Sequence, residues 1–141
     1  MTDVLDLSCE IDLEPAFHDC DPMNVVWHGH YFKYLEIARC ALLRRFNYDY
    51  PQMRDSGWLW PVVDARIKYV RPLHFAQPLK VLAWIVEWES RLKIDYVIRD
   101  AATGSKLTSA HTIQVAVDAA SGELQYVCPR ILWDRLGVEA R

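Results

Sequence analysis

The sequence predicts an α+β fold in which a curled antiparallel sheet of about five strands wraps around one long central helix. Two observations predict it. Between Trp27 and Phe46, apolar residues recur at steps of three and four, the period of a helix with one buried face. One segment before this helix and about four after it alternate apolar with polar residues, as half-buried strands do. A single helix and a single antiparallel sheet bury their apolar faces by packing on each other.

The first strand is expected within residues 7–17, where apolar and acidic positions alternate. The helix follows over residues 27–46, with Gly29 in an irregular first turn. Glu36 and Arg39 are spaced to form an ion pair along its surface. Its buried face is expected to contain Tyr31, Tyr34 or Leu35, Ala38, Leu42 and Phe46.

The next segment, residues 50–57, is expected to be a connection, and a short helix is expected over residues 129–136. The remaining strands are expected over 63–70, 78–89, 92–99 and 108–118, with turns at 100–104 and 119–122. Residues 78–89 are apolar on both faces. Trp84 and Trp88 are therefore expected to pack on the helix, and the other face then calls for a partner, at least a second subunit.

Size and composition narrow the classes of function. The 141 residues, 52% of them hydrophobic, fit one domain over residues 1–141. The net charge of −3 gives no general reason to bind nucleic acid or an anionic membrane. The chain has neither the pattern of a signal peptide nor an apolar run long enough to span a bilayer, so a cytoplasmic protein with no membrane span is expected.

Two carboxylates, Asp19 and Asp21, stand shortly before the predicted helix. The start of a helix offers unpaired N–H groups and a partial positive charge, and these polarise a carbonyl group. A carboxylate facing such donors is suited to acyl transfer. Cys20 between the two carboxylates is a poor nucleophile, because reactive thiolates need electropositive surroundings. The histidines show no metal-ligand spacing, and neither a nucleophile elbow nor a glycine-rich phosphate loop is present.

Residues 19–31 (DCDPMNVVWHGHY), followed by EIAR at 36–39, resemble the signature of hot-dog-fold acyl-CoA thioesterases. The resemblance is to the 4-hydroxybenzoyl-CoA thioesterase family and its tol-pal-associated relatives. YVRP at 69–72 and PLKV at 78–81 are similar to later strand segments of the same family.

The resemblance implies a hot-dog fold assembled as a homodimer or homotetramer, and hydrolysis of an acyl thioester with no metal or organic cofactor. Coenzyme A or phosphopantetheine then enters only as part of the substrate. Asp21 falls on the catalytic carboxylate of the family, as nucleophile or as general base. The N–H of His28 falls where the carbonyl is polarised, and its imidazole is a second catalytic candidate, with packing as the alternative. Asn24, Val25 and Trp27, which lie between Asp21 and His28, are the expected substrate-binding residues.

Three positions depart from the family pattern. Asn24 stands where glycine is common, and Asn is the next most tolerant residue if the backbone there needs φ > 0. Gln77 replaces an aspartate, so any role that a charge carries at that position is weakened. Phe17 replaces a tyrosine. Asp19 is expected to hold the turn.

The alternatives keep the fold and change the ligand. The substrate carrier is either coenzyme A or an acyl carrier protein, because both present phosphopantetheine. A protein that binds acyl groups without hydrolysing them is the other alternative. Candidates to shape the acyl pocket are Tyr48, Tyr50, Trp58 and Trp60, and candidates to meet coenzyme A phosphates are Arg66, Lys68 and Arg71, each with an ordinary packing or solvated role as the alternative.

Overall fold

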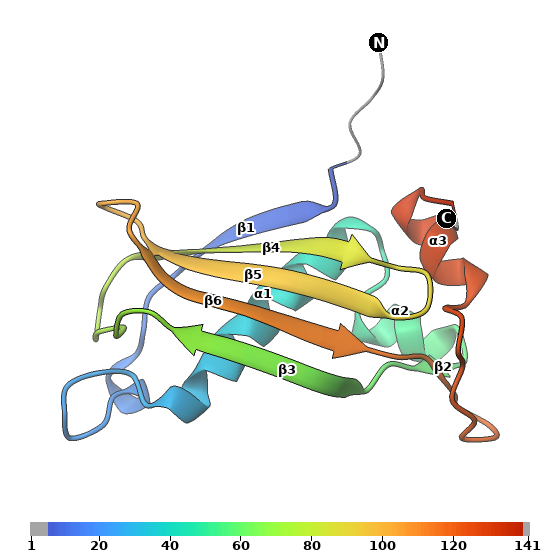
Figure 1. Cartoon of the computed structure of the whole chain (residues 1–141), viewed down its shortest axis with the longest axis horizontal. Coiled ribbons are helices and arrows are strands. Elements are labelled where there is room, and N and C mark those ends of the chain that lie inside the picture. Colours follow the sequence, from blue (N-terminus) through green and yellow to red (C-terminus); the bar gives the residue numbers. More distant parts are fainter. Residues whose placement is uncertain (1–5, 140–141) are drawn as a thin grey trace, which may run out of the picture.

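A computed structural model describes residues 6–139, and its architecture is a five-stranded antiparallel sheet with one long helix on one face (Figure 1). The strands of the main sheet are β1 (Ser8–Leu13), β3 (Val62–Tyr69), β4 (Leu79–Glu87), β5 (Leu92–Asp100) and β6 (Lys106–Gln114). The helices are α1 (Tyr31–Arg45), α2 (Tyr50–Asp55) and α3 (Arg130–Leu136), and β2 (Trp58–Leu59) pairs with β7 (Val117–Asp118). Two short 3₁₀ turns, η1 (Phe17–Asp19) and η2 (His28–His30), precede α1. The predicted α+β arrangement is confirmed.

The order of strands across the sheet is β1-β4-β5-β6-β3, so β1 and β3 form its two edges. Neighbouring strands are antiparallel throughout, and β4 pairs with β5 over nearly its whole length. The strands β3 and β4 are consecutive in the chain but are not neighbours in the sheet. The segment that joins them therefore spans the positions of β6 and β5. In Figure 1, α1 crosses behind the sheet diagonally, from the side of β3 toward the side of β4 and β1.

The central helix matches the prediction closely. Five of the residues named for its inner face are buried: Tyr31, Tyr34, Leu35, Ala38 and Leu42. Phe46 lies just past its end and is partly buried. Glu36 and Arg39 form the expected ion pair, with 2.9 Å between Oε1 and Nη2. The turn η2 leads directly into α1, which is the irregular entry predicted around Gly29.

The prediction for the faces of β4 is wrong. The residues buried on the helix side are Leu79, Val81, Ala83 and Ile85, whereas Trp84 lies on the opposite face and is only partly buried. Trp88 lies beyond the strand and donates from its indole to the carbonyl of Glu139. Medium-sized and small side chains let α1 approach the sheet closely, and an indole at position 83 would fill that space.

Residues 50–57 contain a short helix, whereas the sequence predicts only a connection. Asp49 precedes α2, and its N–H donates a hydrogen bond of 3.1 Å to Gln52 Oε1, which is half of a capping box. Pro51 occupies the first turn, where its missing N–H costs nothing. α3 begins after Pro129, as predicted to within one residue. Within residues 6–139, no helix combines the length and the apolar character needed to cross a bilayer.

Candidate functional site

The segment between β1 and α1 folds as a small hairpin. The N–H of Asp21 donates to the carbonyl of Val25 at 2.9 Å, and the N–H of Trp27 donates to the carbonyl of Asp19 at 3.0 Å. Cys20 and Val26 form an antiparallel β-bridge between these two hydrogen-bonded pairs. The N–H of Val26 also donates to the carbonyl of Leu73 at 2.8 Å, so the segment after β3 holds the hairpin against the fold.

The turn of this hairpin follows from four residues of sequence. Asp21, Pro22, Met23 and Asn24 form a turn closed by a 3.0 Å hydrogen bond from the Asn24 N–H to the Asp21 carbonyl. Pro is favoured at the second position of such turns, and Asp at the first. Asn24 has φ = 65°, the left-handed conformation that the fourth residue adopts when a turn passes into a bulge. The need for φ > 0 at this position is thus confirmed, and Asn tolerates it.

Asp21 is partly buried, and only one of its carboxylate oxygens is engaged. Its Oδ1 accepts a hydrogen bond of 2.8 Å from the N–H of Met23, an interaction typical of Asp at the first position of a turn. Among the hydrogen bonds and ion pairs of residues 6–139, none involves Oδ2. The carboxylate is therefore oriented by the turn and keeps one oxygen for another partner.

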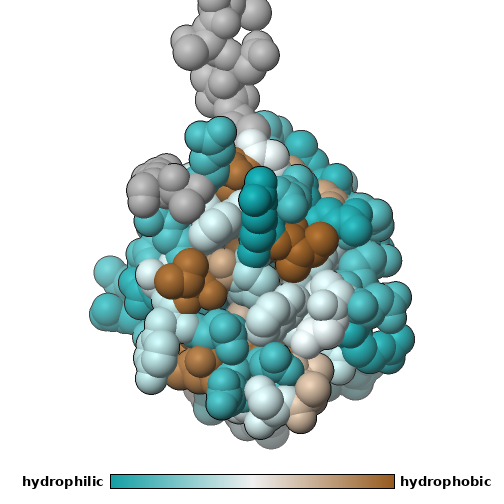
Figure 2. All heavy atoms as spheres, turned by 90° about the vertical axis from the view of Figure 1, so that its right-hand side faces the viewer, coloured by the Kyte–Doolittle hydropathy of each residue, from teal (hydrophilic) through white to brown (hydrophobic). Residues whose placement is uncertain are grey.

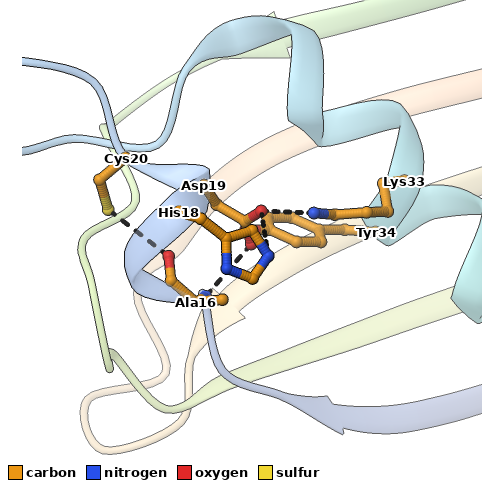
Figure 3. Close-up of polar contacts among 6 residues, drawn as sticks. All are labelled: Ala16, His18, Asp19, Cys20, Lys33 and Tyr34. Carbon is orange, nitrogen blue, oxygen red and sulfur yellow. Dashed lines mark hydrogen bonds and ion pairs between the residues drawn. The ribbon is translucent and has the colours of Figure 1, made fainter.

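Asp19 has different surroundings. It is buried, and its carboxylate accepts hydrogen bonds from the Tyr34 hydroxyl at 2.6 Å and from the Ala16 N–H at 3.1 Å, and pairs with Lys33 (Figure 3). Burial alone would raise the pKa of Asp19, but the bonds from Lys33, Tyr34 and Ala16 together with the Lys33 charge lower it to about 2. Burial raises the pKa of Tyr34, and the hydrogen bond to Asp19 raises it further. Asp19 therefore ties the hairpin to the first turn of α1.

The start of the helical segment presents open backbone donors. The N–H of His30 donates to the carbonyl of Trp27 at 2.9 Å. No acceptor among the described residues pairs with the N–H of His28 or of Gly29. These are the first N–H groups of a helix, which carry a partial positive charge.

Aromatic rings surround this helix start. The Trp27 ring lies over Gly29 so closely that a Cβ added there would be 2.1 Å from its Cζ3. The ring centroids of Trp27 and His28 are 5.0 Å apart, and those of His28 and Tyr69 are 6.4 Å apart. Tyr69 also donates from its hydroxyl to the His28 carbonyl at 3.3 Å. In the sequence, only the YVRP resemblance singles out Tyr69. Its contact with His28 is not visible there, because only folding brings β3 beside η2.

The predicted site residues thus occupy one hairpin, but they do not all touch. Asp21 is the last paired residue before the turn, whereas His28 follows the other strand at its opposite end. Val25 lies beside Asp21, and Trp27 and Asn24 are exposed. Among residues 6–139, no hydrogen bond or ion pair joins the Asp21 carboxylate to the His28 ring. The described residues contain no cluster of His, Cys, Asp and Glu that could hold a metal ion.

The other departures from the family pattern have structural explanations. Gln77 donates from Nε2 to Asp100 at 2.7 Å and accepts from the His74 N–H at 3.0 Å, so a neutral amide bridges two loops there. Phe17 stacks edge-on against Phe75, with 5.6 Å between ring centroids.

A pocket of about 540 Å³ lies farther along α1, between this helix, α2 and β2. Tyr50, Trp58 and Trp60 line it, as three of the four aromatic residues named for a pocket in the sequence. The fourth, Tyr48, is fully buried behind them and accepts a hydrogen bond of 3.1 Å from the Trp60 indole.

Comparison with known proteins agrees with this architecture. A model of the thioesterase-like superfamily matches residues 15–132. The chain is 32% identical over 103 residues to a Bacillus subtilis protein named "Putative acyl-CoA thioesterase YneP", covering 71% of this chain and 75% of that one. Slr0204 of Synechocystis, a 1,4-dihydroxy-2-naphthoyl-CoA thioesterase, superposes with a TM-score of 0.82 at 20% identity, covering 92% and 96% of the two chains. A 4-hydroxybenzoyl-CoA thioesterase complexed with 4-hydroxybenzoyl-CoA gives a TM-score of 0.80 at 17% identity, covering 92% and 99%. These structures share the hot-dog fold predicted from the sequence.

Proposed function

The chain belongs to the thioesterase-like superfamily, and from that premise we propose that it hydrolyses acyl thioesters of coenzyme A. The observation that carries the proposal is the pair of N–H groups at His28 and Gly29, which have no acceptor among the described residues. Open donors at a helix start match the needs of a thioester carbonyl, whose oxygen becomes negative during attack.

In this mechanism the carbonyl oxygen of the thioester accepts from the His28 and Gly29 N–H groups. The donors stabilise the oxyanion more strongly than the neutral carbonyl, by roughly 3–4 kcal/mol for one well-placed donor. The dipole of the helical segment adds about 0.3–1 kcal/mol. Tyr69, bonded to the His28 carbonyl, orients this turn.

Asp21 acts from the other end of the hairpin, as nucleophile or as general base. The hairpin hydrogen bond between Asp21 and Val25 and the one between Trp27 and Asp19 are two residues apart along the strand. At a rise of about 3.4 Å per residue, they are about 7 Å apart. A carbonyl oxygen bound at about 2.9 Å and a carbon attacked at about 3 Å span a gap of that size. Asp21 Oδ2 either bonds to the carbonyl carbon, giving a mixed anhydride that water cleaves, or takes a proton from the attacking water. In both routes coenzyme A leaves as the thiolate and is protonated to the thiol.

The remaining residues of the hairpin bind the substrate in this proposal. Asn24 and Val25 flank Asp21, and the half-exposed Trp27 ring offers an apolar surface to the acyl thioester. The His28 imidazole orients water or donates to the substrate. We further propose that residues 1–141 form one domain that works as a homodimer or homotetramer, with no metal or organic cofactor.

The test of this mechanism is Asp21→Asn, with Asp55→Asn on the exposed side of α2 as the matched control. Free thiol is measured after incubation with a panel of acyl-CoA substrates and, in parallel, acyl carrier protein substrates. Asp21→Asn is expected to lose at least 100-fold in kcat/KM while its thermal midpoint stays close to that of Asp55→Asn. Full turnover by Asp21→Asn would refute the assigned carboxylate.

The parallel substrates separate the alternatives. Thiol release only from acyl carrier protein substrates would move the activity to that carrier. Binding without thiol release by the unmodified protein would make the chain a protein that binds acyl groups without hydrolysing them.

A further inference from the structure

The main sheet has an outer face, which Figure 1 turns to the viewer with α1 behind it. Side chains alternate between the two faces of a strand, so the buried residues of β5 mark the helix side. Lys93, Asp95, Val97 and Arg99 of the same strand therefore belong to the outer face. The register extends this assignment to β6 and β3, because directly paired residues share a face.

Four cations lie near one another on the outer face. Arg66 and Lys68 are two residues apart on β3, and Lys106 of β6 is directly opposite Arg99 of β5. Ser109, the partner of Lys68, follows Lys106 by three residues, at most about 10 Å along the strand. All four cations are exposed, and none takes part in an ion pair of residues 6–139. These four side chains are termed the cationic cluster.

The pairing of Arg99 with Lys106 is unfavourable in the isolated protein, since like charges directly opposite each other on a sheet repel. Lys80 lies opposite Arg99 on its other side, but it pairs with Asp12 at 2.5 Å. Arg99 donates to the carbonyl of Gly104 at 3.3 Å, and this neutral acceptor leaves the charge uncompensated. An anion over this part of the face would relieve the repulsion.

The acids of the outer face lie mainly at its other end. Glu87 accepts two hydrogen bonds from Arg91, at 2.7 and 3.1 Å. The pKa of Arg91 is raised, chiefly by its hydrogen bond to Glu87 and in smaller part by the charge of Asp64. Asp95, in the middle of the face, has His111 directly opposite. The net charge of −3 is thus distributed unevenly, and the cationic cluster is a positive region on an acidic protein.

The composition of the outer face favours a lipid surface over a single-stranded nucleic acid. The outer-face positions of β3, β5 and β6 contain no Phe, Tyr or Trp, since Tyr69 and Tyr96 belong to the helix side. Bases of single strands bind by stacking on such rings. Val70 follows β3 beside the cluster, is 45% exposed, and offers an apolar contact to the lipid headgroup layer.

The end of the molecule with α2, β2 and α3 has a different surface. In Figure 2, which faces this end, hydrophobic side chains reach the surface in separate spots among hydrophilic ones. Arg54 of α2 and Arg135 of α3 are exposed cations outside the ion pairs of the described residues, one on each helix. This end therefore provides a control for the number of charges without their clustering.

We propose that the cationic cluster docks the protein on the surface of a membrane that contains anionic phospholipids. The charged groups meet the lipid phosphates, and each contributes roughly a 5-fold factor to the partition coefficient. Docking through the outer face leaves α1, with the N–H groups at its start, turned away from the membrane. The inference does not depend on the proposed thioester hydrolysis.

Co-sedimentation with vesicles tests the docking. The vesicles contain phosphatidylcholine alone, or phosphatidylcholine with phosphatidylglycerol as about one third of the lipid. The unmodified protein is expected to sediment with the anionic vesicles and to stay in solution with the neutral ones. Arg66→Gln combined with Lys68→Gln is expected to lower the partition coefficient roughly 25-fold. Arg54→Gln combined with Arg135→Gln removes as many charges elsewhere, and is expected to change it by less than about 2-fold.

An unmodified protein that does not bind the anionic vesicles would overturn the proposal, whether or not the variants fold. Equal losses in the two double variants would also overturn it, because net charge alone would then explain the attraction. So would tighter binding of the cluster to a single-stranded oligonucleotide or to an acidic acyl carrier protein in the same buffer. Asp21→Asn is expected to bind vesicles as the unmodified protein does, so loss of docking and loss of hydrolysis are separate results.

Discussion

At the scale of single residues, Asp19 and Asp21 show how the fold gives different surroundings to two carboxylates in one motif. Asp19 is buried against α1 with three donors around it. Asp21 caps a turn through one oxygen and leaves the other available. The family resemblance gives them different roles, catalysis for Asp21 and the turn for Asp19, whereas in the structure it is the Asp21 carboxylate that accepts from the N–H of Met23 in the turn. The Lys33 and Tyr34 partners of Asp19 come from the folded helix, and no local pattern announces them.

The Asp19 contacts predict a dependence of stability on pH. Because the pKa of Asp19 falls from about 3.9 in the unfolded chain to about 2 in the fold, its stabilisation is complete above pH 4 and is lost as the pH falls toward 2. We expect Asp19→Asn to lower the free energy of unfolding by about 2 kcal/mol at pH 7. Urea unfolding at pH 7, 4 and 2.5 measures this difference, which should shrink at the lowest pH. A difference that stays constant across the three pH values would contradict the ionic role.

The turn at Asn24 is the part of the site that the sequence predicts best. Its hydrogen bonds and its positive φ involve only residues 21–25, so local chemistry decides its conformation. Tyr69 and Gln114 are the opposite case. Each acts on a segment more than 40 residues away, Tyr69 on His28 and Gln114 on Trp60. Periodicity within one strand carries no signal for such contacts.

At the scale of elements, the periods of the sequence predict the helix and the main strands well, and the faces less well. β4 is apolar on both sides, so alternation alone does not say which side meets α1. The helix packs on the side with Val81 and Ala83, where small residues allow close approach. The large side chains of Trp84 and Trp88 favoured their face as the one that packs on α1. The structure has the face with smaller residues there, because the space between helix and sheet does not hold an indole.

The junction of η2 with α1 supplies a prediction about Gly29. In Gly29→Ala the new methyl group would collide with the Trp27 ring, 2.1 Å away, so the ring must leave the helix start. We expect a change in tryptophan emission and a fall of at least 10-fold in kcat/KM. The paired change Gly29→Ala with Trp27→Ala serves as the control, since it removes the collision. Activity of the double variant equal to that of Trp27→Ala alone would confirm the cause, and a further loss would point to the glycine backbone itself.

At the scale of the whole molecule, the sheet ends in two edge strands, β1 and β3. β3 is eight residues long, and most of its residues are exposed, including Val62, Val63 and Tyr69. A long edge strand with exposed apolar residues is a site where another strand pairs. The sequence predicts a partner subunit from the two-sided character of residues 78–89, but the geometry of β3 identifies a stronger reason for association.

The β3 edge leads to a prediction about assembly. We expect the protein to be at least a dimer at micromolar concentration, and Val63→Lys to shift it toward the monomer, because a lysine on an edge strand opposes pairing. Val127→Lys is the matched control, since Val127 is 60% exposed, compared with 57% for Val63, and lies outside the sheet. Sedimentation velocity across a concentration series measures the masses.

If Val63→Lys and Val127→Lys associate alike, β3 is not the interface. If Val63→Lys is a monomer that also loses thiol release while Asp21 stays in place, the site needs both subunits, because the change leaves the hairpin of its own chain untouched.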